Sequence, residues 1–147
     1  MKPLTVAIAG NPNSGKTTLF NLLTGSRQKV GNWPGVTVEK KTGPCKISGE
    51  DVNIVDLPGI YSFSAASPDE QIARDFLLSK NADVVVNILD ATSLERGIFL
   101  SMQLLEMGIP VIVVANMMDQ VKELNLQLDI EGLSHELNCP VLQMTNG

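Results

Sequence analysis

The sequence predicts an α/β fold with a mostly parallel, doubly wound sheet. Short apolar segments alternate along the chain with segments of helical periodicity. Two of the apolar segments, 84–89 and 111–115, are nearly continuous and rich in β-branched residues, as expected of strands that helices cover on both faces. A glycine-rich phosphate-binding pattern stands between the first predicted strand and the first predicted helix. In such folds ligands bind at the carboxyl ends of the strands, so we expect the functional site at that edge.

The first third of the chain is predicted to hold one strand, one helix and one long loop. Residues 4–9 are apolar and form the strand, and residues 17–24 form a helix that ends at Gly25. The segment 26–42 has no clear periodicity and contains glycines and a proline. Loops of this length are usually functional or disordered, so we expect an irregular loop that is mobile without ligand.

Two helices in the middle of the chain have recognisable starts. The residues S-P-D-E (67–70) form a predicted capping box with proline at the first helical position. The residues T-S-L-E (92–95) are predicted to form a second capping box, before a helix that ends at Gly108. The other predicted elements are strands at 52–55, 84–89 and 111–115, a helix at 130–137 and a final strand near Val141.

Length and composition indicate one globular domain. The chain has 147 residues, of which 44% are hydrophobic and 18% charged. Its net charge is −5 and no cluster of Lys and Arg offsets it, which argues against a nucleic-acid-binding surface. No apolar run approaches the ~20 residues of a membrane-spanning helix, so we expect this stretch to be soluble. The two cysteines and the single histidine form no recognisable metal or redox motif.

Residues 10–17, G-N-P-N-S-G-K-T, match the complete phosphate-loop pattern G-x-x-x-x-G-K-[ST] between a strand and a helix. Gly10 and Gly15 allow backbone N–H groups to turn toward phosphate oxygens, and the positive end of the helix dipole points the same way. Lys16 can neutralise the β- and γ-phosphates, and the Thr17 hydroxyl can bind Mg²⁺. The pattern therefore predicts a nucleotide site, but adenine and guanine nucleotides carry the same triphosphate.

The segment V-V-A-N-M-M-D places Asn116 and Asp119 at the end of a buried strand. It resembles the N-K-x-D element of GTP-binding proteins, with Met117 in place of the usual lysine. A carboxylate at 119 can accept hydrogen bonds from guanine N1–H and from its exocyclic amine, whereas adenine would leave that carboxylate unpaired. A simple strand-end cap is the alternative for Asp119, but the phosphate loop upstream favours guanine. The missing lysine predicts fast GDP release.

The last residues, T-N-G, follow the final predicted strand, where GTP-binding proteins place a weak base-contacting loop. We therefore include Thr145 and Asn146 among the candidate nucleotide contacts. A closing helix usually follows in such folds, so we expect residues 1–147 to be a GTP-binding domain that lacks this helix.

Five segments together resemble the amino-terminal GTPase domain of the bacterial ferrous iron transport protein B, FeoB. They are G-N-P-N-S-G-K-T, V-G-N-W-P-G-V-T-V-E (30–39), D-L-P-G, D-A-T-S-L-E-R (90–96) and N-M-M-D. The resemblance covers essentially the whole chain. It implies a Ras-like GTPase domain of the P-loop NTPase class, which binds GTP and GDP at the cytoplasmic face of the bacterial inner membrane and regulates ferrous iron uptake. It further implies helical and transmembrane domains downstream, with small cytoplasmic iron-transport accessory proteins as candidate partners.

The resemblance also implies roles for individual residues. Thr37 is similar to a switch I threonine that ligates Mg²⁺ and meets the γ-phosphate, and Asp56 is similar to the carboxylate that holds Mg²⁺ through water. Asn13 matches an asparagine that helps to bind K⁺ beside the phosphates, with backbone carbonyls near Gly31 and Trp33 completing the site. The other implied nucleotide contacts are those of Asn11, Pro12, Ser14, Thr18, Gly35, Val36 and Met117.

The segment D-L-P-G-I-Y raises a question about hydrolysis. Gly59 would sense the γ-phosphate through its backbone N–H. The next residue is a water-orienting glutamine in many GTPases, but here it is Ile60, whose side chain has no hydrogen-bonding group. We therefore expect Lys16, Thr37, Asn13 and Gly59 to carry catalysis, with K⁺ supplying the charge that an arginine supplies elsewhere.

Two other functions stay open at this point. One is a nucleotide-dependent binding module that hardly hydrolyses GTP, which Ile60 favours. The other is a soluble potassium-dependent GTPase linked to the ribosome or to tRNA. The acidic charge and the D-A-T-S-L-E-R segment argue against the second alternative.

Overall fold

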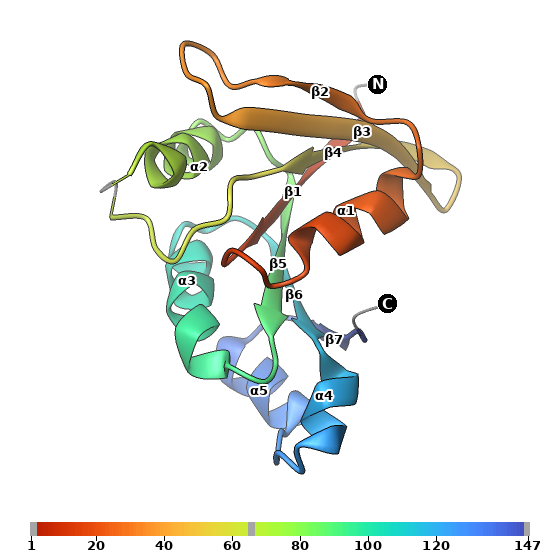
Figure 1. Ribbon diagram of the computed structural model, residues 1–147, viewed down its shortest axis with the longest axis vertical. Helices are drawn as coiled ribbons and strands as arrows, with labels where there is room; N and C mark the ends of the chain where they lie inside the picture. The colour runs from red at the N-terminus through yellow and green to blue at the C-terminus, as the bar shows by residue number, and fades with distance from the viewer. Residues whose placement is uncertain (1–2, 65–66, 146–147) are drawn as a thin grey trace.

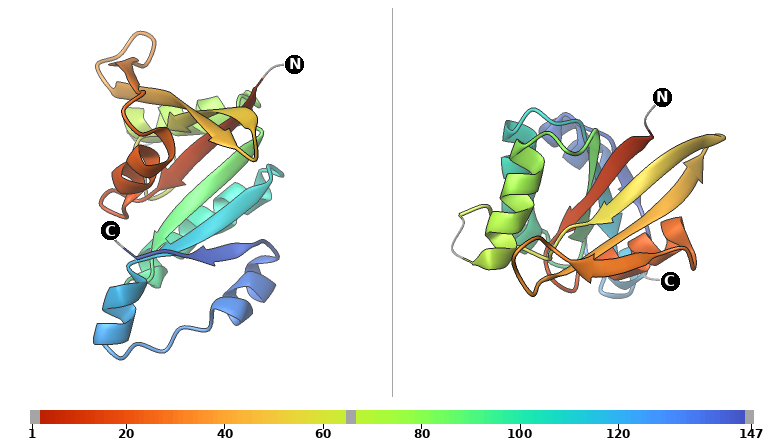
Figure 2. Two further views of the ribbon diagram at one scale, coloured as in Figure 1. Left: turned by 90° about the vertical axis from the view of Figure 1, so that its right-hand side faces the viewer. Right: turned by 90° about the horizontal axis from the view of Figure 1, so that it is seen from above.

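The computed structural model describes residues 3–64 and 67–145 of the chain (Figure 1). They form a seven-stranded sheet with helices on both faces (Figure 2). The strands are β1 (Leu4–Gly10), β2 (Lys29–Asn32), β3 (Glu39–Ile47), β4 (Glu50–Asp56), β5 (Val84–Asp90), β6 (Val111–Asn116) and β7 (Val141–Gln143). The helices are α1 (Lys16–Thr24), α2 (Pro68–Leu78), α3 (Leu94–Glu106), α4 (Met118–Glu123) and α5 (Ile130–Leu137).

The sheet is mostly parallel, as the sequence predicts. Its strand order is β2-β3-β4-β1-β5-β6-β7. The strand β1 lies parallel between β4 and β5, with Ala7 opposite Val55 and Val85, and β6 and β7 continue the parallel part. The pairs β2–β3 and β3–β4 are antiparallel. The prediction of a doubly wound α/β fold is therefore confirmed.

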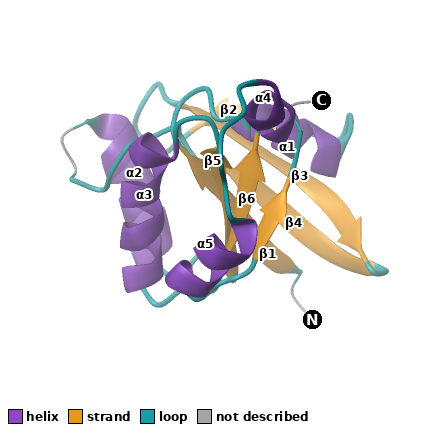
Figure 3. Ribbon diagram, turned by 90° about the horizontal axis from the view of Figure 1, so that it is seen from below, coloured by secondary structure: helices purple, strands orange, loops and turns teal. Residues whose placement is uncertain are grey.

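Figure 3 shows α2 and α3 on the opposite face of the sheet from α1. An apolar core lies under the helices of each face. On one face, Leu77 of α2 and Leu100 and Leu104 of α3 are buried against the sheet, and Leu137 of α5 packs at the edge of the same core. On the other face, the fully buried Phe20 anchors α1. This arrangement fixes the start of α1 beside the carboxyl ends of the central strands.

The segment 26–42 is more regular than the sequence predicts. The strand β2 begins at Lys29 and β3 begins at Glu39, so residues 33–38 form the turn between two antiparallel strands. Every residue of β2 is exposed, and β3 has one buried residue, Gly43. Backbone hydrogen bonds rather than an apolar face hold the β2–β3 edge of the sheet. The sequence of these strands therefore shows no alternation of apolar and polar residues. The short helix α4 was likewise not predicted.

One of the two predicted capping boxes is confirmed and the other is wrong. The Ser67 side chain accepts a hydrogen bond from the backbone N–H of Glu70 at 3.2 Å. At the start of α3, however, the N-cap is Ser93, and its side chain makes no capping hydrogen bond. The backbone N–H of Thr92 donates to Asp90 Oδ1 at 2.9 Å, and the Thr92 hydroxyl donates to the same oxygen. Thr92 is therefore engaged by the end of β5 instead of capping the helix.

Three serine hydroxyls converge on the Glu70 carboxylate near the start of α2. Their oxygens lie 2.7 Å (Ser64), 3.1 Å (Ser62) and 3.3 Å (Ser67) from the carboxylate oxygens. The hydrogen bond from Ser64 is the main cause that lowers the pKa of Glu70 from its ordinary value, burial opposes it, and Ser62 and Ser67 add to it. Glu70 therefore ties the segment after D-L-P-G to α2.

Glu70→Gln is expected to lower the thermal midpoint near neutral pH but not at strongly acidic pH. Because the folded-state pKa of Glu70 is lowered, its carboxylate stabilises the fold fully above the pH at which an unfolded glutamate titrates. This stabilisation is lost as the pH falls through the folded-state pKa. Thermal unfolding of both proteins across this range should give midpoints that converge in acid. Glu106→Gln, on the exposed end of α3, is the control; a gap for Glu70→Gln that stays constant with pH would contradict the expectation.

Candidate functional site

The loop between β1 and α1 is fixed by contacts of its own and by one contact from β6. Gly15 has a φ of 103°, and a Cβ atom there would overlap the side-chain amide of Asn116. A larger residue at 15 is therefore excluded both by backbone conformation and by space. The buried Ser14 donates its hydroxyl to the backbone carbonyl of Asn11 at 2.8 Å. The helix that follows has no acidic residue in its first turn, so its N-terminal N–H groups are available to an anion.

A cavity of about 460 Å³ opens at this loop. Its walls come from the phosphate loop, the D-L-P-G segment, the start of α2 and the end of β6. The lining residues are Pro12, Asn13, Gly15, Lys16, Thr17, Thr18, Gly59, Asp69 and Met117. All of them except Asp69 belong to the nucleotide-binding set predicted from the sequence, so the fold brings these predicted residues together.

An ion pair joins the phosphate loop to the end of β4. Lys16 Nζ lies 2.9 Å from Asp56 Oδ1, and each side chain is 11% exposed. Lys16 and Thr17 line the cavity, and the ion pair holds the Asp56 carboxylate next to Lys16. This is the donor set that a phosphate chain with a divalent cation requires: a positive charge for phosphate oxygens and hard oxygen ligands for the metal.

The D-L-P-G segment is held against β1 and the phosphate loop. The backbone N–H of Leu57 donates to the Ile8 carbonyl at 3.1 Å, and that of Ile60 donates to the Gly10 carbonyl at 3.0 Å. A Cβ at Gly59 would lie 3.0 Å from Pro12 Cα, so the glycine permits this close approach. The Ile60 side chain is 2% exposed and belongs to the core, which keeps it away from the cavity.

The end of β6 contacts the phosphate loop directly. Asn116 is fully buried, and its Nδ2 donates to the Ser14 carbonyl at 3.0 Å. Its Oδ1 is buried without a hydrogen-bond partner among the residues that the structure describes. Met117 has a φ of 66°, caps α4 and lines the phosphate cavity. The two halves of the predicted nucleotide site are therefore joined by one asparagine.

The remaining predicted base contacts lie at the start of α4 and after β7. Asp119 is exposed in the first turn of α4. The backbone N–H of Met118 donates to the Met144 carbonyl at 3.2 Å, which brings the chain after β7 to the start of this helix. Thr145 is exposed there, and Asn146 lies outside the described residues.

The turn 33–38 does not face the phosphate cavity. It lies above α2 in Figure 1, and it is closed by hydrogen bonds from Trp33 N–H to the Val38 carbonyl at 2.9 Å and from Val36 N–H to the Trp33 carbonyl at 3.2 Å. Thr37 is exposed. The predicted site residues of this segment, which are Gly31, Trp33, Gly35, Val36 and Thr37, do not line the cavity at the phosphate loop. The structure therefore does not bring them together with Lys16, Thr17 and Asp56.

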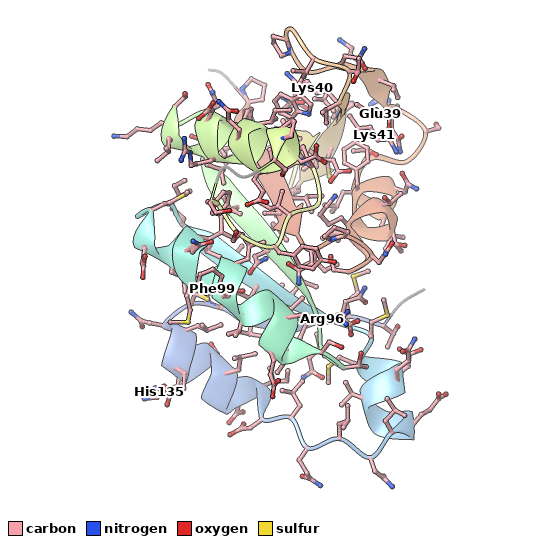
Figure 4. The ribbon with its side chains drawn as sticks, turned by 60° about the vertical axis from the view of Figure 1, so that its left-hand side comes forward. Glu39, Lys40, Lys41, Arg96, Phe99 and His135 are labelled. Atoms are coloured by element: carbon pink, nitrogen blue, oxygen red, sulfur yellow. The ribbon has the colours of Figure 1, made fainter. Side chains whose placement is uncertain are left out.

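Three residues near the site escaped sequence reasoning. Asp69 lines the phosphate cavity from the first turn of α2, and its place in the S-P-D-E capping box was the available signal. Arg96 and Tyr61 line a smaller cavity of about 110 Å³ on the other side of the phosphate loop. Arg96 lies in the first turn of α3 (Figure 4), where the helix dipole disfavours a positive charge. No spacing rule connects these residues to the phosphate loop in the sequence.

Comparison with solved structures supports the fold and the domain class. A mutant of S. thermophilus NFeoB bound to mGDP matches with a TM-score of 0.94 and 49% identity, over 99% of this chain and 55% of that one. The G domain of the T. maritima FeoB iron transporter matches with a TM-score of 0.91 and 43% identity, over 99% of this chain and 89% of that one.

Sequence comparison leads to the same family. The Fe(2+) transporter FeoB of Escherichia coli K12 is 53% identical over 150 residues, which cover 99% of this chain and 19% of that protein. FeoB of Salmonella typhimurium is 51% identical with the same coverage. No helix within residues 3–64 and 67–145 is long and apolar enough to span a membrane. A profile described as ferrous iron transport protein B matches residues 4–146, and the chain therefore belongs to the ferrous iron transport protein B family.

Proposed function

We propose that this chain binds GTP and GDP with Mg²⁺, hydrolyses GTP, and thereby regulates ferrous iron uptake by a larger transporter. The observation that carries the proposal is the cavity where the phosphate loop, the Lys16–Asp56 pair and the D-L-P-G segment meet. The solved relatives include FeoB domains bound to mGDP and GDP. The geometry of the loop accounts for phosphate binding by backbone N–H groups and by the dipole of α1.

The residues around the cavity fit Mg²⁺. This ion prefers oxygen ligands and keeps several waters, and the cavity offers it the Thr17 hydroxyl and the nearby Asp56 carboxylate. When the nucleotide is bound, Mg²⁺ would neutralise charge on its phosphates. Lys16 would then exchange Asp56 for phosphate oxygens, and the carboxylate would face the metal through water. Thr37 would complete the set once the turn 33–38 reaches the cavity.

In the proposed reaction, water attacks the γ-phosphorus in line with the bond to the β-γ bridging oxygen. That bond breaks, and GDP and inorganic phosphate leave. Lys16 stabilises charge on the phosphates, and the backbone N–H of Gly59 binds a γ-phosphate oxygen. Asn13, on the cavity wall, is proposed to hold K⁺.

The choice of guanine rests on Asp119. Asp119→Ala is expected to weaken GDP binding about a hundredfold, because guanine N1–H and the exocyclic amine lose their acceptor. Titration with fluorescent GDP and ADP measures this. Binding of ADP should stay weak and unchanged.

Glu123→Ala, at the far end of the same helix, is the matched control, since it removes one carboxylate from α4 without approaching the cavity. Equal loss of GDP binding in both variants would contradict the role of Asp119.

Met117 stands where a lysine is usual in GTP-binding proteins, and it lines the phosphate cavity. Met117→Lys is expected to slow GDP release roughly tenfold, because the ammonium group adds a charge-assisted contact to the phosphate loop or nucleotide. Displacement of fluorescent GDP by excess unlabelled GDP measures the rate. Gln127→Lys adds the same charge on the exposed loop after α4 and should leave the rate unchanged. A half-life of hours for GDP on the unaltered domain would contradict fast release.

We further propose that this domain acts within a longer polypeptide. The chain spans 19% of the length of the FeoB proteins that it matches. In the proposed arrangement, helical and transmembrane domains follow, the domain lies at the cytoplasmic face of the membrane, and small cytoplasmic iron-transport proteins are candidate partners. The ribosome- or tRNA-linked alternative gains no support from the family. A switch module with negligible hydrolysis stays an alternative, because Ile60 is buried and cannot orient water.

A closing helix remains part of the proposed domain. Beside α1, an apolar hollow of about 370 Å³ runs across the sheet, with lining residues that include Leu4, Val6, Leu23, Val114 and Leu142. Leu4 and Leu142 are 47% and 57% exposed, although apolar sheet faces are normally covered in α/β domains. A helix packed against α1 would cover this face.

A further inference from the structure

The single tryptophan of the chain anchors the turn 33–38 to α2. Trp33 is 6% exposed. Its ring meets the ring of Phe76 on α2 edge to face, with centroids 5.5 Å apart and an interplanar angle of 78°. The ammonium group of Lys40 lies 4.7 Å from the Trp33 ring centroid. Aromatic and cation–π contacts of this geometry are attractive, so the ring is held from two sides.

This anchor determines where the turn lies. Trp33 and Pro34 line a cavity of about 550 Å³ together with Lys40 of β3 and with Ile72 and Phe76 of α2. Lys40 points into this region from the hairpin (Figure 4). Lysine side chains are usually exposed to solvent, but the contact with Trp33 leaves Lys40 half-buried.

The contact of Trp33 with α2 also determines the position of Thr37. Two backbone hydrogen bonds, Trp33 N–H to the Val38 carbonyl and Val36 N–H to the Trp33 carbonyl, make the turn a short closed unit with Trp33 at its base. Thr37 belongs to this unit and lies outside the phosphate cavity. In this arrangement, with Trp33 packed on α2, the turn keeps Thr37 outside the cavity.

Packing stabilises the buried position of Trp33, but one unpaired polar group destabilises it. Its indole Nε1 is buried and has no hydrogen-bond partner in the described part of the chain. A buried N–H without an acceptor destabilises the arrangement that contains it, and such groups are rare in native structures. The ring is therefore held by packing while its N–H favours release, which suits a contact that forms and breaks between two states.

We propose that Trp33 is a positioning residue that sets the preference between GDP and GTP. This inference rests on the proposed function above. Packing against Phe76 and Lys40 stabilises the arrangement in which Thr37 is withdrawn, and GDP, which lacks the γ-phosphate, binds that arrangement. GTP requires Thr37 at the cavity, so its binding energy must release Trp33. Weakening the anchor shifts the equilibrium toward the GTP arrangement and leaves the phosphate loop untouched.

The test compares the ratio of dissociation constants for GDP and a non-hydrolysable GTP analogue. Phe76→Leu removes the aromatic partner but keeps an apolar side chain, and it should shift the ratio toward the GTP analogue roughly twofold to tenfold. Lys40→Gln should shift it in the same direction by a smaller factor. Lys41→Gln is the matched control, because the adjacent Lys41 pairs with Glu39 at 3.5 Å instead of contacting Trp33. The fluorescence of Trp33 should also differ between the two nucleotides in the unaltered domain.

The outcomes are distinguishable. A wild-type ratio in both Phe76→Leu and Lys40→Gln, with identical Trp33 fluorescence in the two nucleotides, would overturn the proposal. A fold defect would weaken both nucleotides together and lower the thermal midpoint without nucleotide. If Phe76→Leu shows such a fold defect, the ratio of dissociation constants measured for Lys40→Gln decides whether the proposal holds. Failure of the unaltered domain to bind either nucleotide would instead count against the proposed function.

Discussion

Lys16→Met is expected to slow GTP hydrolysis by about a hundredfold to a thousandfold and to weaken nucleotide binding. The ammonium group is the positive charge that the chain places beside Asp56 at the cavity, and charge that builds on the phosphates in the transition state needs such a partner. Single-turnover hydrolysis in KCl with enzyme in excess measures the chemical step. A wild-type rate in Lys16→Met would contradict the role of Lys16.

The same substitution has a second effect on the domain without nucleotide. Both partners of the Lys16–Asp56 pair are 11% exposed, so removing the lysine leaves a mostly buried carboxylate without its counter-charge. The free energy of unfolding should fall by about 1–3 kcal/mol, less than for a fully buried pair because the cavity admits water. The double variant Lys16→Met with Asp56→Asn should recover much of this stability but no hydrolysis. Denaturant unfolding without nucleotide, paired with the hydrolysis assay, separates the two effects.

The single-turnover assay also decides between a hydrolase and a switch module. Cleavage by the unaltered domain in KCl supports the hydrolase. Its absence, with normal GDP binding, favours a module that signals through the turn 33–38 and the segment after Gly59.

The parts of the fold predicted from sequence are those whose signals are local. The strand β1 is apolar over Val6 to Ala9 and runs directly into the phosphate loop, so its pattern and its motif agree. The strands β5 and β6 are recognisable because both of their faces carry apolar side chains. The Ser67 cap was also predictable from a local signal, because the backbone N–H that donates to its hydroxyl belongs to Glu70, three residues later.

The parts that were missed depend on contacts far apart in the chain. Asn116 donates to the carbonyl of Ser14, 102 residues away, and no spacing rule contains that distance. The ring of Trp33 packs on Phe76 of α2, a contact that no sequence pattern indicates. For Asn116 and Trp33 a tertiary partner determined the outcome. The missed cap at Thr92 has a local cause instead, because Asp90, two residues earlier at the end of β5, accepts the Thr92 hydroxyl.

The structure sharpens the question of what replaces the missing glutamine. Ile60 is held by its backbone N–H on the Gly10 carbonyl, with its side chain in the core, so residue 60 leaves the catalytic role to other groups. Asn13 is the exposed polar residue of the phosphate loop that lines both the 460 Å³ cavity and the 110 Å³ cavity. Its side-chain oxygen suits K⁺. In the proposed potassium site, the carbonyls of Gly31 and Trp33 would join Asn13 once the turn 33–38 has left α2, so the site would form together with the GTP arrangement.

If the potassium site forms together with the GTP arrangement, potassium should have a large effect on the rate of GTP turnover. Replacing Na⁺ by K⁺ is expected to raise GTP turnover of the unaltered domain about tenfold or more, because a fixed cation beside the phosphates stabilises the charge of the transition state. Asn13→Ala should remove the difference between the two salts and leave GDP affinity nearly unchanged. Turnover measured at equal ionic strength in KCl and NaCl provides the comparison.

The backbone at Asn13 requires a matched control. Its φ of 66° is unfavourable for alanine but not for glycine, so Asn13→Ala loses the side-chain oxygen and also strains the loop. Asn13→Gly loses the oxygen without the strain. If both variants lose the potassium response, the oxygen is responsible; if Asn13→Gly keeps it, the loop conformation was the cause and Asn13 does not bind the ion. Equal turnover of the unaltered domain in both salts would exclude potassium from the role, and the charge would then have to come from a group such as Arg96, which lines the smaller cavity beside Asn13.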